Sequence, residues 1–272
     1  MNLKKYNPTT PSQRNLLQLD RIGLNKKPML KSKIVGIKNS SGRNNTGKIT
    51  SFHKGGGHKK KYRKINFLRT NDTISIVTSI EYDPYRTANI ASLYNFLDKT
   101  YSYILSPKNL KIGDIIKSGE NAEPKNGHSL KISKIPIGSL IHNVSVKENI
   151  KSQISRAAGT FSQLIEKTPN LGRIQLSSGE QRYISINCYA TIGIVSNDLL
   201  FLTTLSKAGR SRWLNRRPKV RGVAMNPIDH PHGGGEGKTS GGRTSSVTPW
   251  GKPTKGGKTS KSKNKFIIFK RK

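Results

Sequence analysis

The stretch TISIVTSIEYDPYRTANIASLYNFLDKTYSYIL, residues 73–105, decides the fold class. In its first ten residues Ile74, Ile76, Thr78, Ile80 and Tyr82 alternate with their neighbours on one face, which is the two-residue period of a β-strand. The Asp-Pro pair at 83–84 predicts a turn. Two more short strands are predicted after it, over 87–96 and 100–105.

The same signals continue along the chain. A turn at Gly113 and Asp114 interrupts residues 110–116, and a Pro-, Gly- and Asn-rich break covers 119–127. Because turn signals recur every eight to twelve residues without a long helical pattern between them, barrels or sandwiches are favoured over βαβ units. We therefore expect two small all-β modules that meet near residue 125. Further strands are predicted over 137–146, 172–176, 181–188 and 191–195, with 177–180 as a hairpin connection.

Helix is expected to be scarce. The best short candidate lies around Asn197 to Lys207, where Asp198 is placed to help cap it. A second amphipathic helix fits the residues up to Arg217, where Pro218 limits it. From Lys207 onward the chain lacks the apolar residues needed to offset the entropy of ordering, so we expect it to be extended or disordered until a partner binds.

The charge is concentrated at the two ends. The 272 residues contain 50 Lys and Arg against 14 Asp and Glu, a formal charge of +36, and only 32% are hydrophobic. Residues 1–70, 71–206 and 207–272 carry +17, +3 and +16. This pattern predicts a balanced globule with two basic arms, because the chain is too polar for one large core.

Such a charge indicates a polyanionic partner that neutralises it, since like charges repel each other in the free compact state. Nucleic acid is the expected partner. An anionic membrane is the runner-up partner and is disfavoured, because the sequence has neither a run of 18 apolar residues nor a long basic amphipathic helix. The single cysteine, Cys188, excludes an internal disulfide and a Cys-based zinc site and indicates a reducing compartment. The first 17 residues lack the apolar core of a signal peptide.

RNNTGKITSFHKGGGHKKKYRKINF, residues 43–67, interleaves cations and aromatic rings around a glycine triplet. Glycines let backbone N–H groups approach phosphates, cations neutralise them, and rings stack on unpaired bases. The alternative is a solvated basic hairpin without a partner. The predicted RNA contacts here are Arg43, Lys48, His53, Lys54, Gly55, Gly56, Gly57, His58, Lys59, Lys60, Tyr62 and Arg63.

KAGRSRWLNRRPKVRG, residues 207–222, places arginines around one tryptophan. Arginine forks bind phosphate in bidentate fashion and stack on bases, which lysine does not do. The alternative makes Trp213 a core anchor among solvated arginines, and both interpretations are compatible. The predicted contacts are Lys207, Arg210, Arg212, Trp213, Arg216, Arg217 and Arg221.

NPIDHPHGGGEGKTSGGR, residues 226–243, looks at first like an active site. A zinc site is disfavoured because His230 and His232 have too few partners of the right kind. A hydrolase using Asp229 and Ser240 is disfavoured because no local core exists to hold it rigid. A P-loop fails because position 232, five before Gly237, is not glycine. The glycines instead predict backbone shaped to thread against a crowded surface.

The order of these motifs closely resembles the family of the universal ribosomal protein two of the large subunit, in its bacterial type. The resemblance rests on RGVAMNPIDHPHGGGEGKTSGGR (221–243), VTPWGKPTKGGKT (247–259) and NKFIIFKRK (264–272). The segments 40–67, 81–91, 135–144 and 207–213 fit the same family in the same order. It covers nearly the whole chain.

The resemblance implies an all-β fold with an OB-like barrel followed by an SH3-like barrel and long basic extensions buried in rRNA. The implied parts are an N-terminal extension over 1–42, the OB-like barrel over 43–125, the SH3-like barrel over 126–200 and a C-terminal extension over 201–272. Additional rRNA contacts are implied at Arg156, Asn226, Lys238, Arg243, Trp250, Lys252, Lys255 and Lys258.

The resemblance also implies a role in translation. A loop near the peptidyl-transferase centre is implied, made of Asp229, His230, His232, Gly233, Gly234, Gly235 and Glu236, with His230 the first residue to test. The implied partners are large-subunit rRNA, neighbouring ribosomal proteins and the small subunit through an intersubunit bridge, with no membrane. We expect no catalytic residue, because the chemistry belongs to rRNA, no metal site, and no cofactor beyond Mg²⁺ carried by the rRNA. The competing functions are a hydrolase centred on His230 and a free single-strand nucleic-acid chaperone.

Some residues depart from the family pattern. Ser152 stands where glycine is common, which predicts an altered loop near Arg156, whereas Ile228 and Lys238 are mild changes. The Asn-, Lys- and Ile-rich composition indicates an A/T-biased genome. With a start at Met1 and no visible presequence, we expect an organelle-encoded protein of the mitochondrial ribosome, in the matrix. The alternative is the cytoplasm of an A/T-rich bacterial symbiont, and a plastid is less favoured.

Overall fold

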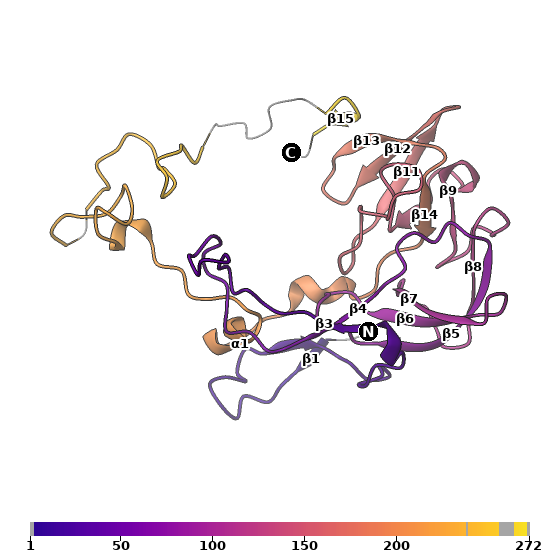
Figure 1. The fold of residues 1–272 in the computed structure, drawn as a ribbon, viewed down its shortest axis with the longest axis horizontal. Helices are drawn as coiled ribbons and strands as arrows, with labels where there is room; N and C mark the ends of the chain where they lie inside the picture. The colour runs from indigo at the N-terminus through magenta and orange to yellow at the C-terminus, as the bar shows by residue number, and fades with distance from the viewer. Residues whose placement is uncertain (1–2, 238, 256–263, 271–272) are drawn as a thin grey trace. The chain divides into compact units, whose positions relative to one another are not determined.

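The computed structural model describes residues 3–237, 239–255 and 264–270, and most of its regular secondary structure is β-strand (Figure 1). The chain divides into two compact units. The first, the sheet unit, contains residues 1–38, 59–210 and 265–272, and the second, the basic unit, contains 39–58 and 211–264. No helix in the described residues is long and apolar enough to cross a membrane.

The sheet unit contains an 11-stranded sheet in the order β15-β13-β12-β11-β10-β14-β9-β8-β5-β6-β7. Its pairs are antiparallel except β8 with β9, which are parallel at Ser118 and Ser129. Two-stranded sheets pair β1 with β2 and β3 with β4. The strands are β1 Leu3–Lys5, β2 Leu17–Leu19, β3 Ile34–Gly36, β4 Lys61–Arg63, β5 Thr73–Glu81, β6 Ile90–Asn95, β7 Thr100–Leu105, β8 Ile115–Ser118, β9 Ser129–Lys131, β10 Leu140–His142, β11 Ser162–Lys167, β12 Leu171–Leu176, β13 Gln181–Ser185, β14 Tyr189–Ile192 and β15 Ile267–Phe269.

Separate hydrophobic cores form on the two sides of the break at 119–127. The core on the C-terminal side is built from β9 to β14 and contains Ile132, Ile141, Leu164 and Ile174, all fully buried. On the N-terminal side, β5 to β8 bury Val77, Leu93, Ile104 and Ile116 among others. The short strands and the two cores agree with the all-β prediction, which is confirmed.

Strand β5 buries polar residues and leaves part of its predicted isoleucine face uncovered. In β5 the buried residues are Ser75, Val77, Ser79 and Glu81, whereas Ile74 is 41% exposed. The polar groups are satisfied inside: Glu81 accepts hydrogen bonds from the Met29 N–H, the Ser79 hydroxyl and the Tyr103 hydroxyl, at 3.0 Å each. The alternation was predicted correctly as far as Val77, and Ile74 is left outward, whereas Ile80, beyond a register shift between Val77 and Ser79, packs against the buried core.

The helix prediction around 197–207 is wrong. The segment forms only a 3-10 helix, η3 Asp198–Leu202, and Asn197 before it is left-handed, with no side-chain cap. The Asp198 carboxylate is used elsewhere, because it accepts a hydrogen bond from the Lys108 ammonium at 2.6 Å. The other helical turns are η1 Lys31–Lys33, η2 Ile132–Lys134, α1 Ala208–Trp213 and η4 Gly222–Ala224. The described part of the C-terminal extension therefore has more local structure than predicted, and α1 ends before Arg217.

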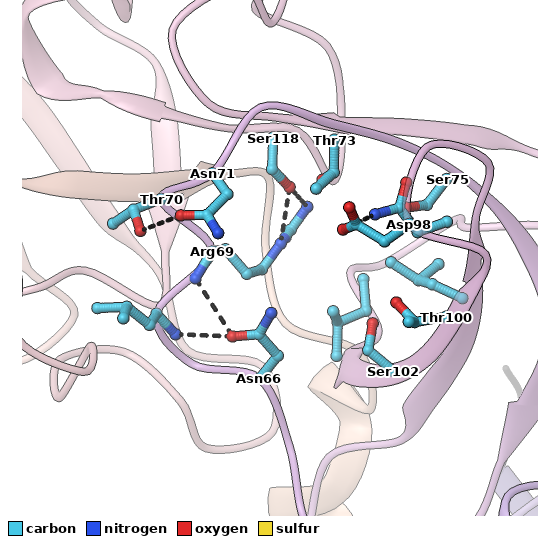
Figure 2. Close-up of a pocket in the computed structure, with 14 residues that line it drawn as sticks. Asn66, Arg69, Thr70, Asn71, Thr73, Ser75, Asp98, Thr100, Ser102 and Ser118 are labelled. Carbon is cyan, nitrogen blue, oxygen red and sulfur yellow. Dashed lines mark hydrogen bonds between the residues drawn. The ribbon is translucent and has the colours of Figure 1, made fainter.

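Arg69 ties together strands on both sides of the 119–127 break, and Figure 2 shows its bonds to Ser118 on the N-terminal side. Its guanidinium is buried and donates to the Ser118 hydroxyl at 2.9 and 3.2 Å, to the Gly127 carbonyl at 3.0 Å and to the Thr191 hydroxyl. Burial lowers the pKa of Arg69 to about 10. A polar cavity of about 170 Å³ lies beside it, and the hydroxyls of Thr73, Ser75, Thr100 and Ser102 help to line it.

Candidate nucleic-acid interface

In the basic unit, the glycine triplet and the arginine–tryptophan segment form one structure. Residues 53–58 run antiparallel to 213–218, with the Arg217 N–H donating to the His53 carbonyl at 2.9 Å and the His58 N–H to the Trp213 carbonyl at 3.2 Å. The His53 ring adds a hydrogen bond from Nδ1 to the Pro218 carbonyl, at 2.9 Å. The two motifs, far apart in the sequence, therefore present their cations together.

Gly57 is the point of closest approach in this pairing. A Cβ built on Gly57 would lie 2.7 Å from the Asn215 Cβ and 2.9 Å from its backbone N and Cα. Such distances are well inside van der Waals contact, and the neighbours are the backbone and the Cβ of Asn215, which cannot swing away. Glycine is required here by space, whereas at Gly55 and Gly56 it is favoured by positive φ values of 128° and 71°.

Aromatic rings remain accessible around this pairing. The His58 ring stacks on Trp213 with centroids 5.5 Å apart, and Trp213 is 43% exposed. Trp250 is 70% exposed and lies 6.0 Å from the ring of Phe52. Trp213 therefore packs partly against the protein and still exposes part of its ring to a partner. The two interpretations of this residue, core anchor and RNA contact, hold together. Exposed rings of this kind stack on unpaired bases.

The cations of the basic unit have no carboxylate partners among the described residues. Seven salt bridges are found in the described part of the chain, and all join residues of the sheet unit. Uncompensated positive charge beside exposed rings favours a polyanion. The described cations of this unit are Arg43, Lys48, Lys54, Arg212, Arg216, Arg217, Lys219, Arg221, Arg243, Lys252 and Lys255, whereas Lys238 and Lys258 lie outside the described residues.

The remaining predicted contacts lie in the sheet unit and differ in accessibility. Lys59, Arg156 and Lys207 are exposed, and Lys60 and Tyr62 are half-buried. Arg210 donates to the Leu205 carbonyl at 2.6 Å. Arg63 is different: it is 5% exposed, and its Nη1 donates to the Lys61 carbonyl at 3.0 Å, so its side chain is committed inside the protein.

Ser152 and Arg156 connect the 147–160 loop to Phe67. The Ser152 hydroxyl and N–H both donate to the Phe67 carbonyl, at 3.0 and 3.3 Å. The Arg156 guanidinium lies 4.8 Å above the Phe67 ring. The serine therefore adds a hydrogen bond that glycine could not make, which fixes this loop to the segment before β5.

The histidines of the glycine-rich loop are used to build the loop itself. His230 is 8% exposed, and its Nδ1 accepts a hydrogen bond from the His232 N–H at 3.0 Å. The His232 Nε2 accepts one from the Val247 N–H, also at 3.0 Å, which connects the loop to the hairpin at 246–254. Because backbone N–H groups can only donate, these two ring nitrogens carry no proton in this arrangement.

Two glycines make room for this arrangement. A Cβ on Gly222 would lie 2.6 Å from three atoms of the His230 ring, and a Cβ on Gly233 would lie 2.4 and 2.5 Å from the carbonyl oxygens of Asn226 and Met225. Gly234 and Gly235 have φ values of 94° and 90°. The sequence did not predict the role of Gly222, because nothing in it except the glycine itself indicates that the His230 ring packs there.

This geometry disfavours metal or acid–base chemistry at the loop. The described residues contain no group of three His, Cys, Asp or Glu side chains placed to hold a metal ion. A hydrolase would need a histidine nitrogen free to take a proton from a serine. Instead, Nδ1 of His230 and Nε2 of His232 both accept hydrogen bonds from backbone N–H groups, and Asp229 and Glu236 are exposed.

Comparison with known proteins agrees with the sequence motifs. Residues 30–118 match the model for the RNA-binding N-terminal domain of ribosomal proteins L2, and residues 125–251 match the model for their C-terminal domain. The chain belongs to the ribosomal protein L2 family. The L2 models cover both motif-bearing segments, 43–67 and 207–243, and the order of the two domains fits an OB-like barrel followed by an SH3-like barrel.

Curated L2 relatives span the whole chain. The large ribosomal subunit proteins uL2 of Rickettsia peacockii (strain Rustic), Rickettsia rickettsii (strain Sheila Smith) and Rickettsia akari (strain Hartford) are each 54% identical to it over 275 residues. The alignments cover 100% of this chain and 100% of each relative. The bacterial type of the family, predicted from the motifs, is therefore confirmed.

Proposed function

We propose that the chain is a structural protein of the large ribosomal subunit that binds rRNA mainly through its basic unit. The observation that carries this proposal is the pairing of 53–58 with 213–218, which unites unpaired cations, exposed rings and close-packed backbone. The protein acts as an RNA-binding component rather than as an enzyme, because its loop histidines are committed to backbone hydrogen bonds.

The proposed contact residues follow from accessibility. They are the sequence-predicted cations, rings and glycines with the exception of the buried Arg63 and Gly55, and Lys219 joins them because it is exposed in the same arginine-rich segment. Direct contact of Lys238 and Lys258 with rRNA is proposed from the sequence alone. Mg²⁺ enters this interface only as part of the rRNA.

We propose a positional role for the loop of Asp229, His230, His232, Gly233, Gly234, Gly235 and Glu236. It lies beside the peptidyl-transferase centre in this proposal and supports tRNA placement, while the protein contributes to subunit association through an intersubunit bridge. The histidines hold the loop in shape, and Ile228 at 93% exposure and the exposed Asp229 reach outward. The loop then supports a catalytic centre made of RNA by fixing its surroundings.

Salt-dependent binding of an rRNA fragment tests the main proposal. The logarithm of affinity falls with the logarithm of salt concentration by about 0.9 for each neutralised duplex phosphate. Replacing Arg216 and Arg217 by Gln is expected to lower affinity and to reduce that slope, whereas Lys111→Gln, an exposed lysine of the sheet unit, leaves the slope unchanged. Equal slopes for both variants would contradict the proposed interface.

We also propose that the ribosome concerned is mitochondrial, with a bacterial cytoplasm as the alternative. The A/T-biased composition supports either source, and the 54% identity to Rickettsia proteins supports a bacterial ancestry. Locating the coding gene on an organellar or a bacterial chromosome decides between them. Detection of the chain in large subunits from purified mitochondria is the expected result, and its absence there would overturn the mitochondrial proposal.

A further inference from the structure

The N-terminal extension is attached to the rest of the sheet unit at two places. At the first, the Asn25 N–H donates to the carbonyl of Ile80 in β5, at 2.9 Å. Leu30 follows and is buried against Tyr103 of β7, whose hydroxyl accepts a hydrogen bond from the Leu30 N–H at 3.0 Å. The second attachment lies earlier in the chain, at the hairpin of β1 and β2. The segment between the two attachments is therefore held at both ends and is not a free basic tail.

The second attachment joins this hairpin to the start of the C-terminal extension. Leu17 and Thr204 pair as an antiparallel bridge, in which the Thr204 N–H donates to the Leu17 carbonyl at 3.1 Å. The Leu17 N–H donates to the Thr204 hydroxyl, also at 3.1 Å, and that hydroxyl donates to the Asn15 carbonyl. Leu16, between these partners, is buried. Positions that are 187 apart in the sequence are thus joined through one threonine.

Two further residues fix the chain between this bridge and α1. The Arg210 guanidinium donates from Nη1 to the carbonyls of Ser12 and Leu205, at 3.3 and 2.6 Å, so it also connects the hairpin to the C-terminal extension. Ser206 has a φ of 63°. A residue other than glycine keeps this left-handed conformation only where its surroundings hold it. The turn that leads into α1 is therefore held in part by the N-terminal hairpin.

This junction leads directly into a segment of the candidate interface. The helix α1 begins at Ala208 and ends at Trp213, the residue whose ring stacks on His58. A flexible segment that becomes ordered when a ligand binds lowers the affinity, because its conformational freedom is lost at that step. A segment that is already held in the free protein avoids this loss. Contacts at residues 204–210 can therefore raise the affinity for a ligand that they do not touch.

We propose that the N-terminal hairpin is a brace that holds residues 204–210 in place before rRNA binds, with Thr204 as the positioning residue. The inference rests on the proposed function, because that function supplies rRNA as the ligand whose affinity the brace raises. It gives Leu17 and Thr204 an indirect role, in which neither side chain contacts RNA. Direct contact of the threonine hydroxyl with RNA is the competing outcome of the test.

Hydrogen exchange in the RNA-free full chain tests the brace itself. Thr204→Val keeps the branched shape of the side chain but removes the hydroxyl that accepts from the Leu17 N–H. We expect exchange of the Leu17 and Thr204 amides to accelerate about 2- to 12-fold, the change for one lost hydrogen bond, and Thr204→Ser to restore the protection. Thr9→Val is the matched control, because the Thr9 hydroxyl bonds to Gln13 within the loop of the hairpin. Unchanged exchange in Thr204→Val would overturn the inference.

A reversible cross-link separates bracing from direct contact with RNA. Partners in an antiparallel bridge have Cα atoms about 4.5–5.5 Å apart, which suits a disulfide, so oxidation can close the double variant Leu17→Cys, Thr204→Cys. The natural Cys188 is buried. We expect the oxidised variant to bind an rRNA fragment within about twofold of the wild type, and the reduced variant to bind about 2- to 12-fold more weakly with the same salt slope.

Both redox states lack the threonine hydroxyl, so only the brace distinguishes them. Equal affinities would overturn the inference, whether both are weak, as direct contact of the hydroxyl with RNA predicts, or both match the wild type. Failure of the proposed function has a different signature. In that case the wild type shows no salt-dependent binding of the rRNA fragment, and hydrogen exchange of the Leu17 and Thr204 amides still decides whether the brace exists.

Discussion

The two loop histidines should be rescued by different amides. Nδ1 of histidine is separated from Cβ by the same number of bonds as Oδ1 of asparagine, and Nε2 by the same number as Oε1 of glutamine. Because Val247 donates to Nε2 of His232, His232→Gln retains an acceptor and His232→Asn does not. The order reverses at His230, whose Nδ1 accepts from the His232 N–H, so His230→Asn retains the acceptor.

The size of the loss in stability of the loop follows from the burial of the donor, the Val247 N–H. Val247 is 8% exposed, so its N–H loses its partner without gaining full access to water when His232 becomes alanine. A buried unsatisfied donor costs about 1–3 kcal/mol, which corresponds to a roughly 5- to 150-fold change in the local opening equilibrium. We expect the same loss for His232→Asn and a loss of less than about threefold for His232→Gln.

Hydrogen exchange of the Val247 amide in the full chain measures this directly. Protection should fall in His232→Ala and His232→Asn and return in His232→Gln. Nitrogen NMR of the wild type should find the proton of His232 on Nδ1 and that of His230 on Nε2. Rescue by asparagine instead of glutamine at position 232, or unchanged protection in His232→Ala, would refute the hydrogen-bond assignment.

Three further outcomes follow from packing and burial. Gly57→Ala should lower rRNA affinity about 5- to 150-fold in filter binding, because overpacking against Asn215 costs about 1–3 kcal/mol. The slope of log affinity against log salt should not change, because no charge is removed. Gly209→Ala is the control, because a Cβ at Gly209 meets nothing within 4 Å. Burial lowers the pKa of His142 from 6.5 to about 4, so the free energy of unfolding should be highest above pH 6.5 and fall by about 3 kcal/mol in all as the pH drops from 6.5 toward 4. Urea unfolding should find this loss largely absent in His142→Asn. An equal loss in both proteins would contradict the prediction. Ser152→Gly should destabilise the chain by about 0.5–1.5 kcal/mol in thermal unfolding, because the hydroxyl bond to Phe67 is lost, whereas Ser240→Gly, at an exposed position, should change little.

The sequence predicted the strand periods well because alternation and turn residues are local signals. It did not predict which face of β5 is buried, because that depends on partners distant in the sequence. Glu81 is tolerated inside only where Met29 and Tyr103 supply donors, and neither is adjacent to it in the chain. The helix around 197–207 failed for a similar reason, since Asp198 pairs with Lys108 instead of capping.

The segments of the candidate site could be predicted from their composition, but the way in which they pair with each other could not. Charge and glycine content identified both 43–67 and 207–222, yet nothing local indicates that His58 stacks on Trp213 or that Gly57 meets Asn215. Arg63 shows the corresponding error, because a cation in a basic run was expected to face a partner and is buried instead. Burial is a tertiary property, so neighbouring charges do not report it.

The glycine-rich loop separates residues that shape it from residues that face outward. His230 packs over Gly222, and His232 connects to Val247, so substitution of either histidine changes the loop's conformation before it changes any contact with RNA. Ile228, at 93% exposure, makes no such connection among the described residues. A histidine substitution that impairs translation therefore does not by itself indicate acid–base chemistry. Loss of function in His230→Ala together with recovery in His230→Asn would assign the effect to loop geometry, because asparagine restores the acceptor but cannot transfer a proton as imidazole does.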